Sequence, residues 1–236
     1  MPPTNRPYPR FIGDASREGR PYGRWEERLR EAFVDECRPL AAEAGSELDP
    51  MTVKWFPDRS WGGRTYVPAS GRAGAPTASE DGESILVEYF GWVSFAADDD
   101  EAEPADLRAK ADFTDVTAED NPDWKIDLND DVLGRWRTDG GRAGDVTLIW
   151  GLPLVRGAVV ATAEIESEVV DQAAVNDGRF TLLAVDAIEG FPDDLYVTVR
   201  LWDRAVREVA SETLYADPAG EEPETDEPEP GAHPAP

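Results

Sequence analysis

The amino-acid sequence predicts a mainly β fold: an antiparallel β-sandwich or meander with one N-terminal amphipathic helix and disordered termini. An α+β fold is the alternative. From residue 51 onward, apolar and polar residues alternate in short runs, and Gly-, Asn- and Asp-rich turn signals separate these runs. One segment near the N-terminus instead repeats its apolar residues at helical spacing. The 236-residue chain is 40% hydrophobic and contains 8 Trp and 8 Phe, which is enough apolar material for a globular core.

Residues 1–23 are rich in Pro, Gly and Arg, and we interpret them as an extended basic arm. A short motif nearly repeats in this arm, because Arg6-Pro7-Tyr8-Pro9-Arg10-Phe11 is followed by Arg20-Pro21-Tyr22-Gly23-Arg24-Trp25. Two hypotheses follow: the copies are docking motifs for a partner, or their aromatic side chains pack on the chain's own domain, which the sequence favours. The candidate binding residues of the arm are Tyr8, Arg10, Phe11, Tyr22 and Arg24.

The amphipathic helix is expected between Trp25 and Ala44, where apolar residues share one face. Pro39 should kink or split it, and Gly45 suits its C-terminal cap. Cys37 lies on the apolar face, so we interpret it as a small buried residue. It is the only cysteine, which excludes an internal disulfide, and the cytoplasm is the expected location.

Residues 24–118 are expected to form a helix plus β-hairpin region. The strand candidates Met51–Phe56 and Arg64–Pro68 flank a Gly-rich turn, and a loop follows over residues 70–83. Ile85–Phe95 carries apolar residues on both faces, which predicts a central strand covered on both sides. Within it, Gly91 indicates a bulge or a close approach of another backbone. The last segment, residues 107–113, alternates as a half-buried strand does, with a helix as the alternative.

Residues 119–216 are expected to form an antiparallel β region, either separately or as one domain with residues 24–118. Its strand candidates are Trp124–Leu128, Val132–Thr138, Asp145–Leu152, Ala158–Ile165, Val169–Val175, Arg179–Ile188 and Leu195–Trp202. Residues 205–215 fit a helix or a strand, and a strand is favoured because only Asp203 and Arg204 separate them from the preceding strand. The Glu- and Pro-rich residues 217–236 predict a disordered acidic tail.

Acidic residues dominate the chain, whose formal net charge is -27. Residues 98–131 carry 14 acidic and 3 basic side chains, and the tail carries 7 acidic and no basic ones. Because phosphate backbones are bound by Lys and Arg, no nucleic-acid partner is expected. No apolar run approaches the ~18 residues of a membrane helix, and no signal peptide is visible at the start, so no membrane partner is expected either.

Catalytic chemistry is restricted by the single histidine, His233, which lies in the tail. A Ser-His-Asp triad, Cys-His catalysis and a zinc site are therefore not available in the folded part, and the sequence favours a protein that is not an enzyme. Asp127, Asn129 and Asp131 match the start of a calcium loop, but Val132 replaces its glycine and Thr138 its glutamate. A solvated acidic loop is the favoured interpretation of this segment.

Two further groups of residues are candidates for binding. Trp61 lies in a Gly-rich turn between Arg59 and Arg64, and these three residues predict a binding contact at a loop tip. The alternative is that Trp61 folds over its own hairpin. A carbohydrate site would need paired carboxylates and aromatic platforms, for which the available side chains are Trp55, Trp61, Trp92, Asp58 and Glu88.

The expected function is a non-enzymatic protein-binding or assembly protein with a β-rich body, a basic arm and an acidic tail. One alternative is a carbohydrate- or calcium-binding β-sandwich module, with carboxylate-based hydrolysis as a variant. Another is an acidic mimic of nucleic acid. No cofactor is expected except Ca²⁺ under the first alternative, a protein partner is expected, and the oligomeric state is left open.

Overall fold

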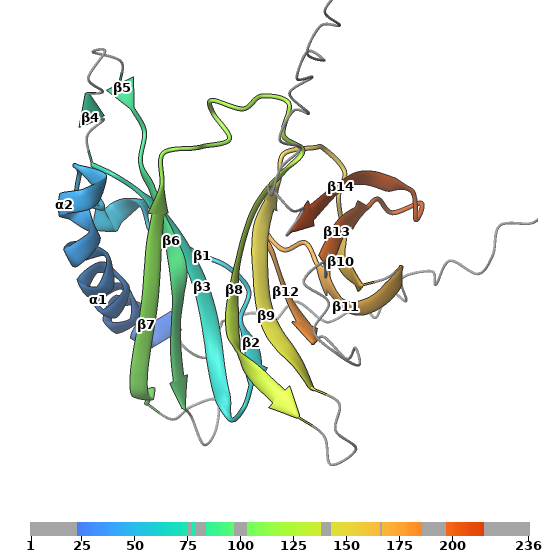
Figure 1. Ribbon diagram of the computed structural model, residues 1–236, viewed down its shortest axis with the longest axis horizontal. Coiled ribbons are helices and arrows are strands. Elements are labelled where there is room, and N and C mark those ends of the chain that lie inside the picture. The colour runs from blue at the N-terminus through green and yellow to red at the C-terminus, as the bar shows by residue number, and fades with distance from the viewer. Residues whose placement is uncertain are drawn as a thin grey trace, which may run out of the picture.

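The protein is built in four layers, one helical and three of antiparallel strands (Figure 1). The computed structural model describes residues 23–74, 77–78, 84–96, 103–137, 143–165, 167–185 and 197–214. The predicted arm up to Tyr22, the acidic run Asp98–Glu101 and the acidic tail lie outside these residues. The mainly antiparallel β fold with one N-terminal helical segment is confirmed.

The helical layer consists of η1 (Gly23–Trp25), α1 (Glu26–Cys37), η2 (Arg38–Leu40) and α2 (Ala41–Ala44). The predicted interruption at Pro39 is confirmed, since this residue lies in the 3-10 turn between the two α-helices. Gly45 ends the segment in the left-handed conformation, with φ 69°, as a C-terminal cap requires. Leu29, Phe33 and Cys37 are buried in the core that α1 forms with the first sheet.

The first sheet has the order β1-β3-β6-β7, and β2 pairs with β3. Its strands are β1 (Lys54–Trp55), β2 (Arg59–Trp61), β3 (Arg64–Arg72), β6 (Glu88–Ala96) and β7 (Ala105–Thr114). The short strands β4 (Thr77–Ala78) and β5 (Ser84–Ile85) pair only with each other. Residues 107–113 are thus in a strand, as predicted.

Two predicted boundaries in this sheet are wrong. The strand expected over Met51–Phe56 is reduced to Lys54–Trp55, because Pro50–Thr52 forms the 3-10 turn η3, capped by Asp49, which accepts a hydrogen bond from the Met51 N–H. The loop expected from residue 70 begins later, since β3 continues to Arg72 by pairing with β6.

Strand β6 is covered on both faces, as its sequence predicts. Tyr89 and Val93 are buried in the core against the helix, whereas Phe90 and Trp92 pack in the core on the opposite face. The predicted close approach at Gly91 is confirmed as well: a Cβ added there would lie 2.0 Å from the carbonyl oxygen of Lys110.

The second sheet has the order β12-β9-β8, and the third has the order β11-β10-β13-β14. The second contains β8 (Ile126–Arg137), β9 (Ala143–Pro153) and β12 (Phe180–Val185). The third contains β10 (Val160–Ile165), β11 (Glu168–Ala174), β13 (Val197–Trp202) and β14 (Glu208–Leu214). The last strand confirms the favoured interpretation of residues 205–215.

Two separate strands were predicted over Trp124–Leu128 and Val132–Thr138, but Ile126–Arg137 forms one strand, β8. It pairs with β9 from Ile126 opposite Pro153 to Arg137 opposite Ala143, and an irregularity between Val132 and Gly134 absorbs a register shift. Polar residues between the predicted strands suggested a loop. They are compatible with a strand because β8 lies at the edge of its sheet.

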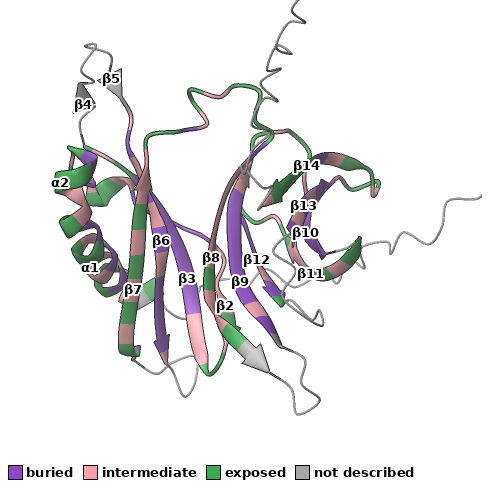
Figure 2. Cartoon of the chain, viewed as in Figure 1, coloured by how far each residue is buried: buried purple, intermediate pink, exposed green. Residues whose placement is uncertain are grey.

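Three cores lie between the four layers (Figure 2). One joins the helix to the first sheet, one joins the second and third sheets, and a smaller core that includes Phe56, Tyr66, Leu148 and Trp150 joins the first sheet to the second. Among the described residues, no helix has the length and apolarity that crossing a membrane requires.

Candidate binding pocket between the first and second sheets

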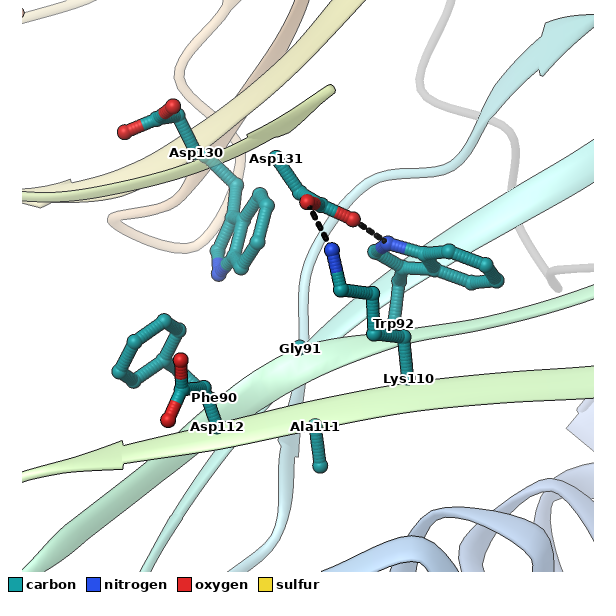
Figure 3. A pocket seen from close by; sticks show the side chains of 9 residues that line it. Phe90, Gly91, Trp92, Lys110, Ala111, Asp112, Asp130 and Asp131 are labelled. Atoms are coloured by element: carbon teal, nitrogen blue, oxygen red, sulfur yellow. Dashed lines mark hydrogen bonds and ion pairs between the residues drawn. The ribbon is translucent and has the colours of Figure 1, made fainter. Parts of the chain in front are cut away.

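A cavity of about 60 Å³ lies beside the core that joins the first sheet to the second (Figure 3). This volume would hold roughly four water molecules, or one small polar group. The lining residues come from β6, β7, β8 and β9, and they are Phe90, Gly91, Trp92, Lys110, Ala111, Asp112, Asp130, Asp131 and Trp150.

The strand registers explain why these side chains meet. On the first sheet, Trp92 pairs with Lys110 and Phe90 pairs with Asp112. Directly paired residues of neighbouring strands project from the same face. All four therefore share the face of the first sheet that is turned to the second sheet, where Phe90 and Trp92 pack against Trp150 of β9.

Asp131 joins the two sheets at this pocket. Its carboxylate accepts a hydrogen bond from Trp92 Nε1 at 2.7 Å and an ion-paired hydrogen bond from Lys110 Nζ at 2.5 Å (Figure 3). The Asp131 side chain is only 16% exposed, while that of Lys110 is 57% exposed. Asp131 is therefore bonded on both oxygens and is not a free anion in the pocket.

Asp112 carries the acidic character of the cavity. Its Oδ1 accepts a hydrogen bond from the Phe113 N–H at 2.8 Å. Within the described ranges it forms no ion pair. Figure 3 shows its carboxylate beside the ring of Phe90, whereas the carboxylate of Asp130 is turned away from Lys110. An aromatic face beside an unneutralised carboxylate favours a cationic group.

Trp150 lines the same cavity and has a buried indole N–H. The residue is fully buried, at 0% exposure, and its Nε1 has no hydrogen-bond partner in the part of the chain that the structure describes. Thr181, which pairs with Trp150 across β9 and β12, also has a buried hydroxyl without a described partner. Buried polar atoms are usually bonded, so the Trp150 N–H is an exception among the described residues.

Two more carboxylates, Glu88 and Asp127, lie on the strands that flank the pocket, β6 and β8. Burial raises the pKa of Glu88, and the neighbouring Asp127 carboxylate raises it further, against smaller opposing effects of Arg72, the Ser70 hydroxyl and Lys54. Burial also raises the pKa of Asp127, with partial compensation by Arg72 and Lys54. These two acids therefore hold protons more strongly than exposed carboxylates do.

The three predicted calcium ligands lie in β8 rather than in a loop. Alternate residues of a strand share one face at spacings of about 6.8 Å, so Asp127, Asn129 and Asp131 form a row. In the described part of the chain, no three His, Cys, Asp or Glu side chains gather as metal ligands would. Calcium binding by these residues stays a prediction.

The predicted binding residues of the β2–β3 hairpin contact other parts of the protein. Arg64 is 13% exposed and donates to Ser94 Oγ at 3.2 Å and to Asp106 Oδ2 at 2.6 Å. Arg59 pairs with Asp171 of β11 over 3.6 Å. Trp61 packs against the core between the first two sheets, over Gly134, where an added Cβ would lie 3.1 Å from its ring. Their role in binding a partner stays a prediction.

The outcome for the remaining predicted site residues differs between the arm and the tryptophans. Arg24 lies in η1, and Tyr8, Arg10, Phe11 and Tyr22 are outside the described residues. Of the tryptophans considered for a carbohydrate site, Trp55 lies in the core against the helix, and Trp61 and Trp92 pack in the next core.

Sequence reasoning assigned Phe90, Lys110, Asp112 and Trp150 to strands but did not connect them. The alternation in each strand indicated the face on which each side chain lies, but the pairing of β6 with β7 and the stacking of two sheets were needed to bring them together. No family model, curated protein or solved structure matches this chain.

Proposed function

We propose that this protein is a non-enzymatic protein-binding protein, and that its inter-sheet pocket takes the guanidinium group of an arginine on the partner. The observation that carries the proposal is the combination of Asp112, Phe90 and Trp150 at one cavity. A cytoplasmic location is part of the proposal. Its support is the single cysteine, since exported proteins more often carry disulfides.

Arginine suits this cavity better than lysine does. A planar guanidinium can lie on the ring of Phe90 while it donates to the Asp112 carboxylate, and it loses less hydration energy than a compact ammonium does. The indole of Trp150, which lines the cavity, would pack beside the bound group. The acidic balance of the chain, -27, supports a basic partner because it speeds the approach of positively charged segments.

The test is an NMR titration of the full-length protein with the blocked tripeptide acetyl-Gly-Arg-Gly-amide. We expect saturable shifts of the Trp150 indole N–H and the Gly91 and Ala111 amides, and a severalfold weaker affinity in Asp112→Asn. Glu212→Gln, an exposed acid on β14, is the matched control and should bind as the wild type does. The same peptide with Gln in place of Arg reports any binding that does not need the cation.

The proposal fails if the pocket signals do not move, or if Asp112→Asn and Glu212→Gln bind the arginine peptide equally well. It also fails if the Gln peptide shifts the pocket signals as strongly as the Arg peptide, because binding would then not depend on the guanidinium group.

A further inference from the structure

The chain itself contains a segment with the chemistry that the pocket favours. Residues 1–22 carry Arg6, Arg10, Arg17 and Arg20 against two acidic residues, and the first two arginines flank Pro7-Tyr8-Pro9. Prolines limit the conformations of a free segment, so less entropy is lost when it binds. An arginine-rich segment of low entropy is a suitable ligand for an acidic, aromatic pocket.

The point at which this segment leaves the fold sets which arginines can reach the pocket. Gly23 begins the helical layer, which covers one face of β6 and β7 (Figure 1). The pocket lies on the other face of the same strands. Arg28 of α1 pairs with Glu103, two residues before β7 starts. The arm therefore starts close to the beginning of β7.

The path from Gly23 to the pocket can be estimated from standard dimensions. On β7, the pocket residues Lys110 to Asp112 lie about six residues beyond Ala105, the first residue of the strand. This distance is roughly 20 Å at strand spacing. Passing around this edge strand to the other face of the sheet adds on the order of 10–15 Å. The whole path is therefore roughly 30–35 Å. An extended chain spans at most about 3.5 Å per residue, so the backbone of Arg20 extends at most about 10 Å from Gly23 and that of Arg17 about 20 Å. The backbone of Arg10 extends to about 45 Å, which is enough to reach the pocket.

We propose that the first copy of the arm motif, Arg6 to Phe11, occupies the inter-sheet pocket of its own chain and competes there with the partner's arginine. This proposal rests on the proposed function. Because the arm is tethered, its effective concentration at the pocket is in the millimolar range, which is enough to compete with a weakly bound segment. Arg6 or Arg10 would pair with Asp112 beside Phe90.

The experiment compares two full-length double variants that remove the same charge. Arg6→Gln/Arg10→Gln alters the arginines that can reach the pocket, and Arg17→Gln/Arg20→Gln alters those that cannot. With acetyl-Gly-Arg-Gly-amide as the probe, we expect the first variant to bind about threefold or more tightly than the wild type, since the tethered competitor is lost. The second variant should bind as the wild type does. Before the probe is added, the pocket signals of Gly91, Ala111 and the Trp150 indole should differ from the wild type only in the first variant.

Each other outcome overturns the inference in a recognisable way. If the probe binds but both double variants match the wild type, the arm does not dock, and the proposed function still stands. Equal gains in affinity for the probe in the two variants would mean that the net charge of the arm, and not docking of one motif, sets the affinity. Pocket signals that change when the wild type is diluted from 1 mM to about 10 µM would identify a second copy as the occupant. If the probe binds to none of the proteins, the proposed function and this inference fail together.

Discussion

The indole nitrogen of Trp92 on β6 donates a hydrogen bond to the carboxylate of Asp131 on β8 over 2.7 Å, which links the first sheet to the second. We expect Asp131→Ala to destabilise the protein by about 1–3 kcal/mol, because the Trp92 N–H is left without its acceptor. Urea denaturation measures the change. Lys110→Met is the control, since it leaves the bond from Trp92 in place and removes an ion pair whose lysine is 57% exposed, a pair worth about 1 kcal/mol or less. Equal losses in the two variants would contradict a structural role for the indole bond.

A methyl group at Gly91 should be far more damaging than one at Gly157. Both residues have positive φ, +156° and +89°. At Gly91 an added Cβ would lie 2.0 Å from the Lys110 carbonyl oxygen, whereas at Gly157 nothing lies within 4 Å. We expect Gly157→Ala to cost about 1–2 kcal/mol for backbone strain and Gly91→Ala to cost about 4 kcal/mol or more. Chemical denaturation of both variants provides the measurement, and comparable losses would show that β6 and β7 can separate at low cost.

Replacing Glu88 by Gln should stabilise the protein at neutral pH and have less effect in acid. The pKa of Glu88 is raised by burial and then by Asp127, so the folded state binds this proton more strongly than the unfolded state does. The free energy of unfolding therefore falls as the pH rises from the pKa of Glu88 in the unfolded state to its higher pKa in the folded state, and Glu88→Gln removes this loss. Thermal melts from pH 4 to pH 8 test the prediction, with Glu212→Gln as an exposed control. A gain that does not depend on pH would indicate that charge burial is not the cause.

The same pair of acids gives a second electrostatic prediction. Since the Asp127 carboxylate raises the pKa of Glu88, Asp127→Asn should lower that pKa. Carbon-detected NMR titration of the Glu88 carboxyl group measures it directly. An unchanged titration curve in Asp127→Asn would mean that the two carboxylates do not interact across the sheets.

Cys37 should be almost unreactive in the native protein. It is 1% exposed, and burial, with a smaller contribution from Glu36, raises its pKa from 9.0 to about 12. Because the thiolate is the reactive form, its population at pH 8 is roughly a thousandfold lower than that of an exposed cysteine. Iodoacetamide labelling of the native and the urea-unfolded protein at pH 8 tests this. Equal labelling rates would show that the helix opens readily from the first sheet.

Local patterns predicted those parts of the fold that depend on nearby residues. The alternation in β6 indicated which side chains face each core, and the signals at Pro39 and Gly45 located the ends of the helices. The continuous strand β8 was missed because its charged residues resemble a loop, and only its pairing with β9 shows that they lie on an edge strand. The pocket was missed for a similar reason: Trp92 and Asp131 are 39 residues apart, and no local signal brings two separate sheets into contact.

The order of the layers also bears on how the chain folds as it is made. The core against the helix uses residues from Trp25 to Phe113, and the core between the last two sheets uses residues from Ile126 to Leu214. A nascent chain on the ribosome can thus complete its first core before the residues of the last one are synthesised. The contact between the halves, with its bond from Trp92 to Asp131, uses residues up to Leu183, so it can be completed only after β12 has been synthesised.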